Sequence, residues 1–347
     1  MNQARAQSEI RAAVIGLGRH GLRHVQAVQQ IENVKLAAVC DARAEALAQV
    51  TKDHPEVKAY TDWRQLLETE QLDLVSVVTN GPSHAPITLA AAQSGARYIL
   101  CEKPMATSVS EARAMIDACN EAGVRLTISH GRRWVSSYQE LRDLIAAGVI
   151  GKLAHFWFTC GGGLFAGNGG HIIDLARMLS QSNATAVVGK LDQSGAPNPR
   201  GKEFQDPGAV ALYWFENGMR LVVDMYEDLN VPPRIEIVGS HGRIRIDDLS
   251  GQWEILSRPE DERAAAQSQY WLPLRPVPFE PVELNMIDML VDALQELLSD
   301  GKISCTGEDG LASVEMLIGA HISSQRGGML IQLPLTGADQ QVRIAFT

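Results

Sequence analysis

The sequence predicts an α/β Rossmann fold with a doubly wound parallel sheet, followed by an α+β domain with a large, mostly antiparallel open sheet. Three observations support this prediction. Apolar runs alternate with amphipathic helical stretches over the first 130 residues, a glycine-rich turn follows the first apolar run, and hairpin-like alternation appears beyond residue 150. Because 347 residues exceed one ordinary core, we expect two domains, at residues 1–130 and 131–347.

The first part of the chain contains six strand candidates. They consist mainly of Val, Ile, Leu and Ala, as strands buried on both faces require. They span residues 11–16, 34–40, 57–60, 72–78, 96–101 and 124–129, with helical stretches between them. The last helical stretch opens with a Ser108/Glu111 capping-box pattern and closes at Gly123. Strand–helix alternation with right-handed crossovers gives a doubly wound parallel sheet.

The second part of the chain has the pattern of an antiparallel sheet. Turns such as Glu216-Asn217-Gly218 join its strand candidates, which span residues 152–160, 185–193, 209–227, 234–248 and 251–257. Residues 261–282 are Pro-rich and irregular, which indicates a long surface connection. Two further helical stretches follow at 283–300 and 308–325.

The composition indicates which partners and which cellular compartment to expect. The net charge of −10 gives no electrostatic reason to expect a nucleic-acid partner, because affinity for the phosphate backbone comes from clustered Lys and Arg. Five scattered cysteines without a CxxC pair favour free thiols in a reducing compartment. The N-terminal residues lack the apolar segment of a signal peptide, and no run approaches the length of a membrane span. We therefore expect a cytoplasmic protein with no membrane partner.

A Gly-Leu-Gly-Arg-His-Gly segment directly follows the first strand and opens a helix. In a dinucleotide-binding turn, Gly16 permits the tight bend, Gly18 lets the backbone approach the pyrophosphate, and Gly21 allows the helix to pack closely on the strand. The helix N-terminus then presents free N–H groups to the phosphates. Arg19 and His20 lie in this turn and are assigned to the same cofactor site.

Asp41 ends the second strand, twenty residues after Gly21. At that position a carboxylate can accept hydrogen bonds from the adenosine ribose hydroxyls. Asp41 would repel a 2′-phosphate, so the sequence favours NAD over NADP. Arg43 could still stack on adenine or meet a phosphate, which leaves NADP possible. The alternative is a glycine turn followed by a helix N-cap aspartate.

The fifth strand ends in Cys101-Glu102-Lys103-Pro104, at the carboxyl edge where open α/β sheets bind ligands. Pro104 has no N–H and disfavours helical backbone at Lys103, so the lysine leaves the sheet in a fixed direction. Taken alone, this segment could equally be a plain turn at the end of a strand.

Several motifs occur in one order along the chain and together resemble the glucose–fructose oxidoreductase / inositol dehydrogenase / rhizopine catabolism (Gfo/Idh/MocA) family. They are GLGRHG, CDAR, TNGPSH, CEKP, HGRRW, GVIGKL and HIIDLARML, and the resemblance covers nearly the whole chain. It implies an NAD(P)-dependent oxidoreductase that transfers hydride between nicotinamide and a secondary alcohol or ketone of a sugar, cyclitol or sugar derivative. It also implies that the second domain binds this small polyol-like substrate.

The resemblance assigns roles to residues in the first domain. Lys103 would be a catalytic and substrate-binding residue that lies beside the nicotinamide and hydrogen-bonds the reacting hydroxyl or carbonyl. Glu102, Thr79 and Asn80 would contact the cofactor, although TNGPSH departs from the more usual Pro-Asn form of that segment. His84 is either a further cofactor contact or a helix-start residue with no catalytic role.

The second catalytic element is a glycine-rich stretch that ends at His171 and continues as an amphipathic helix. By resemblance, His171 donates or accepts a proton, and Asn168, His171 and Asp174 bind the substrate. The family usually carries a carboxylate four residues before this histidine, where this chain has Gly167, so Asn168 or Asp174 could partly replace it. A histidine satisfied by backbone is the alternative. His171 and Asp174 without a third ligand nearby in sequence do not make a metal site, so no metal is expected.

Other functional classes stay open. One is an NAD-dependent glycosidase of the same family, and another is a non-catalytic dinucleotide or sugar sensor on the same fold. Retention of both Lys103 and His171 argues against the sensor. An exposed face of the antiparallel sheet favours a homodimer or homotetramer. The residues Arg132, Arg133, Trp134 and Tyr138 could line the cleft or only hold the two domains together.

Overall fold

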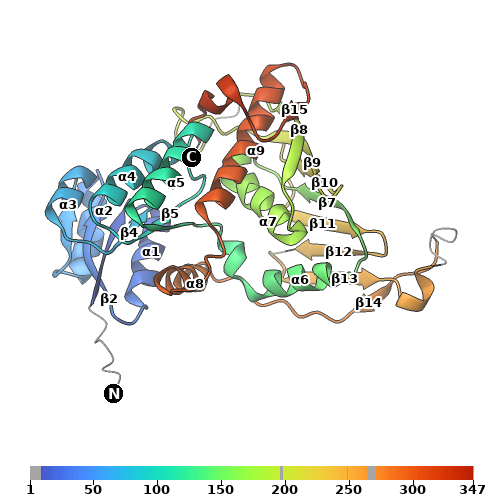
Figure 1. The fold of residues 1–347 in the computed structure, drawn as a ribbon, viewed down its shortest axis with the longest axis horizontal. Coiled ribbons are helices and arrows are strands. Elements are labelled where there is room, and N and C mark those ends of the chain that lie inside the picture. Colours follow the sequence, from blue (N-terminus) through green and yellow to red (C-terminus); the bar gives the residue numbers. More distant parts are fainter. Residues whose placement is uncertain (1–8, 196–197, 248, 265–270, 347) are drawn as a thin grey trace. The chain divides into compact units, whose positions relative to one another are not determined.

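Figure 1 shows the computed structural model, which describes residues 9–195, 198–247, 249–264 and 271–346. The chain forms two compact units. The first unit comprises Met1–Gly131 and Asn285–Leu311, and the second comprises Arg132–Leu284 and Ala312–Thr347. Two sequence-based expectations fall partly outside the described residues. The expected absence of a signal peptide concerns residues 1–8, and the expected irregular connection includes residues 265–270.

The first unit is built on a six-stranded parallel sheet with the strand order β3-β2-β1-β4-β5-β6. Its strands are β1 (Ile10–Ile15), β2 (Val34–Cys40), β3 (Lys58–Tyr60), β4 (Leu74–Val77), β5 (Tyr98–Cys101) and β6 (Arg125–Ile128). The connecting helices are α1 (Arg19–Gln29), α2 (Ala44–Asp53), α3 (Trp63–Thr69), α4 (Gly81–Gln93) and α5 (Val109–Ala122). The strand order reverses between β1 and β4, which is the switch point where such sheets bind ligands. The predicted doubly wound parallel sheet is confirmed.

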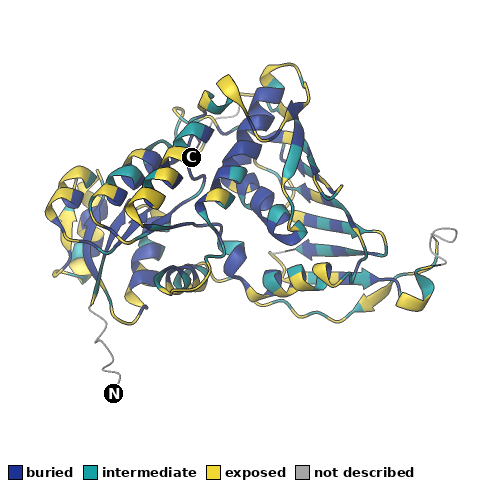
Figure 2. Cartoon of the chain, viewed as in Figure 1, coloured by how far each residue is buried: buried dark blue, intermediate teal, exposed yellow. Residues whose placement is uncertain are grey.

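Helix α8 (Met286–Leu298) returns to the first unit from late in the sequence. Its residues Leu290, Leu294 and Leu297 are buried in the same core cluster as Val25 and Val28 of α1. The sequence-based division at residue 130 had placed this helix in the second part of the chain. Burial of its apolar face, dark blue in Figure 2, accounts for the difference.

The second unit contains a nine-stranded mixed sheet with the order β14-β13-β12-β11-β7-β10-β9-β8-β15. The strands are β7 (Leu153–Thr159), β8 (Ala184–Leu191), β9 (Ala209–Phe215), β10 (Arg220–Asp224), β11 (Arg234–Gly239), β12 (Gly242–Asp247), β13 (Gln252–Ser257), β14 (Arg275–Val277) and β15 (Ile331–Gln332). The pair β7–β10 is parallel, and the other neighbouring pairs are antiparallel. The predicted large, mostly antiparallel sheet is confirmed. Strand β14 lies within the stretch that the sequence predicted to be irregular.

The helical segments that accompany this sheet are η1 (Gly131–Trp134), α6 (Ser136–Ala146), the π-helical turn η2 (Phe165–Gly169), α7 (Gly170–Ser180), η3 (Glu260–Glu262), α9 (Gly307–Gln325) and η5 (Gly337–Gln341). Alternate residues of the sheet point to a buried face, where the Tyr213 hydroxyl of β9 donates to the carbonyl of Met316 in α9. On the opposite face, Trp157 of β7 is 45% exposed. Among the described residues, no helix combines the length and apolar character that crossing a membrane requires.

Candidate active site

The turn between β1 and α1 has the geometry that its glycines predict. Gly16 has φ +101°, and a Cβ at this position would overlap the carbonyl oxygen of Val78. A Cβ on Gly21 would overlap the carbonyl oxygen of Gly16. A Cβ on Gly18, in contrast, would meet no atom of the described residues within 4 Å apart from its chain neighbours, so the space beside that backbone is open. The turn therefore fits a dinucleotide pyrophosphate at the N-terminus of α1.

Asp41, directly after β2, is tied to this turn. Its Oδ2 accepts a hydrogen bond from the Leu17 N–H at 2.8 Å, and its Oδ1 accepts one from the Arg43 N–H at 2.9 Å. The Arg43 guanidinium donates to both oxygens. Burial raises the pKa of the Asp41 carboxyl, but the hydrogen bonds from Arg43 and Leu17 outweigh burial, so this pKa lies below its ordinary value. An ionised Asp41 beside the turn is suited to accept hydrogen bonds from the ribose hydroxyls of a dinucleotide.

We expect Asp41→Ser to narrow or reverse the preference for NAD over NADP. The substitution removes the charge that repels a 2′-phosphate and releases the Arg43 guanidinium, which can then pair with that phosphate. Calorimetric titration of the full chain with NAD⁺ and NADP⁺ measures both affinities. Asp53→Ser, at the far end of α2, is a matched control that should leave the preference unchanged. Equal affinities of the unsubstituted protein for the two cofactors would contradict the role of Asp41.

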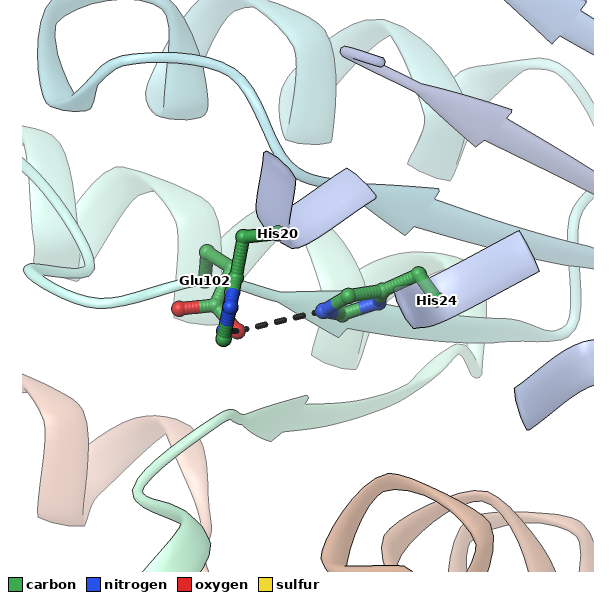
Figure 3. A group of neighbouring side chains, drawn as sticks. All are labelled: His20, His24 and Glu102. Atoms are coloured by element: carbon green, nitrogen blue, oxygen red, sulfur yellow. Dashed lines mark hydrogen bonds and ion pairs between the residues drawn. The ribbon is translucent and has the colours of Figure 1, made fainter. Parts of the chain in front are cut away.

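The buried carboxylate of Glu102 collects hydrogen-bond donors directly after β5. Its Oε1 lies 3.1 Å from Nε2 of His20 and 3.2 Å from Nε2 of His24, both on α1 (Figure 3). Its Oε2 accepts the N–H of Lys103 at 3.2 Å. Burial raises the pKa of Glu102, but the hydrogen bonds from the two histidines outweigh burial and hold this pKa well below its ordinary value. Glu102 is therefore ionised and fixes the backbone on the N-terminal side of Lys103.

His24 belongs to this site, although the sequence analysis did not identify it. It is fully buried, and its Nδ1 lies 2.6 Å from the Ser76 hydroxyl of β4. Burial lowers the pKa of His24, so the imidazole is neutral near pH 7. The spacing of His20 and His24, one helical turn apart, was the available sequence signal. On the other side of His20, its Nδ1 lies 3.3 Å from the Arg23 guanidinium.

His84 connects the loops that follow β4 and β5. It is buried in α4, with Nδ1 2.8 Å from the Pro104 carbonyl oxygen and Nε2 2.9 Å from the Thr79 carbonyl oxygen. Burial lowers the pKa of its imidazole. Because both ring nitrogens face protein carbonyls, His84 acts as a structural tie, and the expected cofactor contact has no ring nitrogen left to make it. The same tie fixes the backbone on the C-terminal side of Lys103.

The predicted contacts at the end of β4 differ in exposure. Asn80 is exposed at the start of α4. The hydroxyl oxygen of Thr79 is buried and has no hydrogen-bond partner among the described residues. Buried hydroxyls are normally hydrogen-bonded, so a polar group of a ligand would fit at Thr79. Arg19, the first residue of α1, is exposed beside the same turn.

In the second unit, the glycine-rich stretch forms the turn η2 and continues into α7, where His171 is the second residue and Asn168 is exposed. Asp206, which the sequence analysis missed, accepts hydrogen bonds from the Ala166 N–H at 2.6 Å and the Gly167 N–H at 2.9 Å. The turn before His171 therefore does have a carboxylate bound to its backbone, but this carboxylate belongs to Asp206 and not to a residue at position 167. This contact joins residues about forty positions apart, so no local pattern signals it.

Asp174 of α7 is 1% exposed and forms a buried ion pair with Arg133. Its two oxygens accept hydrogen bonds from the Arg133 guanidinium at 2.8 and 2.7 Å. The sequence analysis assigned Asp174 to the substrate because it lies three residues after His171, a spacing that does not reveal burial. The observed role of Asp174 is to hold α7 to the segment that contains Arg133.

We expect Arg133→Met to destabilise the protein strongly. Removal of one partner leaves the Asp174 charge buried without its main counter-charge, which typically lowers the free energy of unfolding by about 3–5 kcal/mol. The double variant Arg133→Met/Asp174→Leu should recover part of this loss, because the buried carboxylate is gone and Arg177, which also pairs with Asp174, keeps its hydrogen bond to Asn183. Denaturant unfolding of the full chain, followed by circular dichroism, checks the prediction. Equal stability of the single variant and the unsubstituted protein would contradict it.

Comparisons with known proteins match both units. A family model described as an oxidoreductase family with an NAD-binding Rossmann fold matches residues 10–130, and the GFO/IDH/MocA C-terminal domain matches residues 156–245. The D-apiose dehydrogenase of Paraburkholderia graminis is 27% identical, with 91% of this chain and 88% of that protein covered. The myo-inositol 2-dehydrogenase of Thermotoga maritima is 26% identical, with 87% and 92% covered.

A solved structure shows the same fold. The crystal structure of an oxidoreductase domain protein from Kribbella flavida matches this chain with a TM-score of 0.79 at 24% sequence identity. The match covers 95% of this chain and 100% of that one. The sheet orders described above therefore belong to an arrangement already observed in a crystal.

Proposed function

Because the chain belongs to the Gfo/Idh/MocA oxidoreductase family and its first unit is an NAD-binding Rossmann domain, we propose that it transfers a hydride between NAD and a sugar, cyclitol or sugar derivative. The reacting group is a secondary alcohol or the corresponding ketone. The relatives named as D-apiose and myo-inositol dehydrogenases support this substrate class. The observation that carries the proposal is the backbone at Lys103, anchored on both sides at the carboxyl edge of the sheet.

The proposal gives separate roles to the cofactor and to the residues of the site. Bound NAD supplies the hydride chemistry. The turn from Gly16 to Gly21 binds the pyrophosphate, and the carboxylate of Asp41 accepts hydrogen bonds from the ribose hydroxyls. Lys103 holds the reacting oxygen and assists the transfer of its proton. For His171, the family resemblance implies a role as proton donor or acceptor.

A substrate panel tests the proposed reaction. The full chain is incubated with NAD⁺ and a set of polyols, cyclitols and aldoses, and the absorbance of reduced nicotinamide is followed. We expect at least one compound of this class to reduce NAD⁺, and Lys103→Met to abolish the signal. Cleavage of a glycoside that requires NAD but yields no net NADH would favour the glycosidase alternative. Tight binding of NAD and sugars without any turnover would favour the sensor.

The exposed face of the nine-stranded sheet supports a homo-oligomer, and we propose a second copy of this chain as its partner. Strand register places Trp157 beside Val222, Val222 beside Leu212, and Leu212 beside Val188, so one apolar row crosses four strands. Such contiguous apolar surface is uncommon on monomers. An identical copy can cover it through a two-fold interface, giving a dimer or, with a second interface, a tetramer.

We expect Trp157→Glu to shift the oligomer toward monomer, because a buried carboxylate opposite its own copy is costly. Light scattering coupled to size-exclusion chromatography measures the mass. Met329→Glu, at a residue that is 60% exposed elsewhere in the second unit, is the matched control. A Trp157→Glu protein with unchanged mass would contradict this interface.

The state of the cysteines supports a reducing compartment for this protein. All five lie among the described residues, are buried and form no disulfide, which favours a reducing environment. We therefore place the chain in the cytoplasm as part of the proposal.

A further inference from the structure

His20, His24 and Glu102 form a compact group of metal-binding side chains in the first unit. His20 and His24 lie at i and i+4 on α1, so both imidazoles leave the same face of the helix. One ligand atom from each histidine and from Glu102 lie within 4.8 Å of one another. Glu102 and His24 are buried and His20 is half-buried, so the group is shielded from solvent on most sides. Figure 3 shows the three side chains directed toward one another.

We propose that His20, His24 and Glu102 bind a divalent transition-metal ion of the zinc class. Two histidines and one carboxylate are one of the ligand sets of three-ligand zinc sites, in which water takes the fourth position. Glu102 Oε1 lies 3.1 Å from His20 Nε2 and 3.2 Å from His24 Nε2. Tetrahedral coordination with bonds of about 2.0–2.2 Å separates neighbouring ligand atoms by roughly 3.3–3.5 Å. The two contacts of Glu102 are close to this spacing, and the nitrogens of the two histidines lie within 4.8 Å of each other, so metal binding requires side-chain shifts that bring the three atoms to this spacing.

Ser76 provides the second layer of this site. Metal-binding histidines usually donate their other ring N–H to a fixed acceptor, which sets the tautomer and the orientation of the ring. The Nδ1 of His24 lies 2.6 Å from the Ser76 hydroxyl, which can accept as well as donate. His24 can therefore carry its proton on Nδ1 and present the lone pair of Nε2 to the ion.

Arg23 competes with the ion for His20. Its guanidinium lies 3.3 Å from His20 Nδ1 and 2.9 Å from the Met286 sulfur. Because arginine only donates hydrogen bonds, this contact stabilises the tautomer in which His20 carries its proton on Nε2, the atom that must face the metal. Metal binding therefore displaces Arg23, whose side chain is not buried. Substitution of Arg23 should strengthen the site, whereas substitution of a ligand should abolish it.

No metal was expected from the sequence, where His171 and Asp174 have no third ligand nearby, and the group of His20, His24 and Glu102 gave no local signal. His24 and Glu102 are 78 residues apart, and only the parallel sheet brings the start of α1 to the end of β5. Glu102 also fixes the backbone at Lys103, but metal binding can be measured without the oxidoreductase reaction. A test without NAD or substrate therefore keeps the two proposals separate.

Cobalt titration tests the site, because four-coordinate Co²⁺ has intense visible absorption bands and replaces Zn²⁺ readily. The full chain, freed of metal by chelator and without NAD, is titrated with Co²⁺ and then with competing Zn²⁺. We expect one equivalent of Co²⁺ to bind with a four-coordinate spectrum and Zn²⁺ to displace it. Ser76→Ala should weaken binding by about 10–100-fold, as loss of a second-layer partner usually does. Arg23→Gln should strengthen it.

His20→Ala decides the matter, because His20 is half-buried and its removal leaves no cavity in the core. We expect this variant to lose the four-coordinate spectrum while its thermal unfolding stays close to that of the unsubstituted protein. His54→Ala, at the end of α2 beside Gln29, is the matched control and should bind cobalt normally. Absence of stoichiometric binding, or a spectrum unchanged by His20→Ala, would show that the group is only a hydrogen-bonded network.

Discussion

Gly18→Val is expected to abolish dinucleotide binding without unfolding the chain. Gly18 has φ −66° and ψ −179°, an extended conformation that valine adopts readily. Within the part of the chain that the structure describes, a Cβ at Gly18 meets no atom within 4 Å beyond its chain neighbours, so we expect the new side chain to fill the space proposed for the pyrophosphate. Loss of two charge-assisted hydrogen bonds to the phosphates, at about 1.5–3 kcal/mol each, weakens binding by at least about a hundredfold.

Calorimetry with NAD⁺ and a thermal unfolding scan of the full chain measure both parts of this prediction. Gly21→Val serves as the contrasting variant, because its Cβ would overlap the carbonyl oxygen of Gly16 and should lower stability as well as binding. Normal NAD⁺ affinity in Gly18→Val would show that the phosphates bind elsewhere. Unfolding of Gly18→Val would instead contradict the open space seen beside this residue.

The parallel sheet could be predicted because its signal is local. The central residues of β1 must be apolar on both faces, and Ala12, Ala13 and Val14 are indeed fully buried. Strand ends were less accurate: the apolar run at residues 72–78 is longer than β4, because apolar composition continues beyond the last ladder hydrogen bond. Helix α8 was assigned to the wrong unit, because an amphipathic helix does not specify which core buries it.

The site divides in the same way between local and distant signals. Spacing along the sequence was enough to predict the geometry of the glycine turn and the place of Asp41 beside it, whereas their roles toward the cofactor stay predictions. The partners of Glu102 and the Asp206 carboxylate at η2 were not predictable, because both contacts join segments far apart in sequence. For His84 and Asp174 the residue type indicated chemistry, but burial gives each of them a structural partner.

Lys103 is held more firmly than its place in a loop would indicate. Its N–H donates to Glu102, whose carboxylate is fixed by two histidines, and the next carbonyl, that of Pro104, is fixed by His84. Such anchoring matters for a catalytic group, because precise placement of a reacting partner contributes a large part of the rate. The anchors are side chains of the first unit alone, so the position of the Lys103 backbone does not depend on bound substrate.

Lys103→Met is therefore expected to lower turnover by at least about 10²–10⁴-fold, the usual contribution of a positioned acid–base group, with little change in NAD affinity. Methionine keeps most of the side-chain volume but removes the charge and the hydrogen bond to the reacting oxygen. His171→Ala should retain more activity and flatten the acidic limb of the pH–rate profile. Steady-state kinetics with the substrate found in the panel measures both, and Lys35→Met, on the exposed edge of β2, is the control. Near-native turnover of Lys103→Met would overturn the mechanism and leave Lys103 only a contact of bound cofactor.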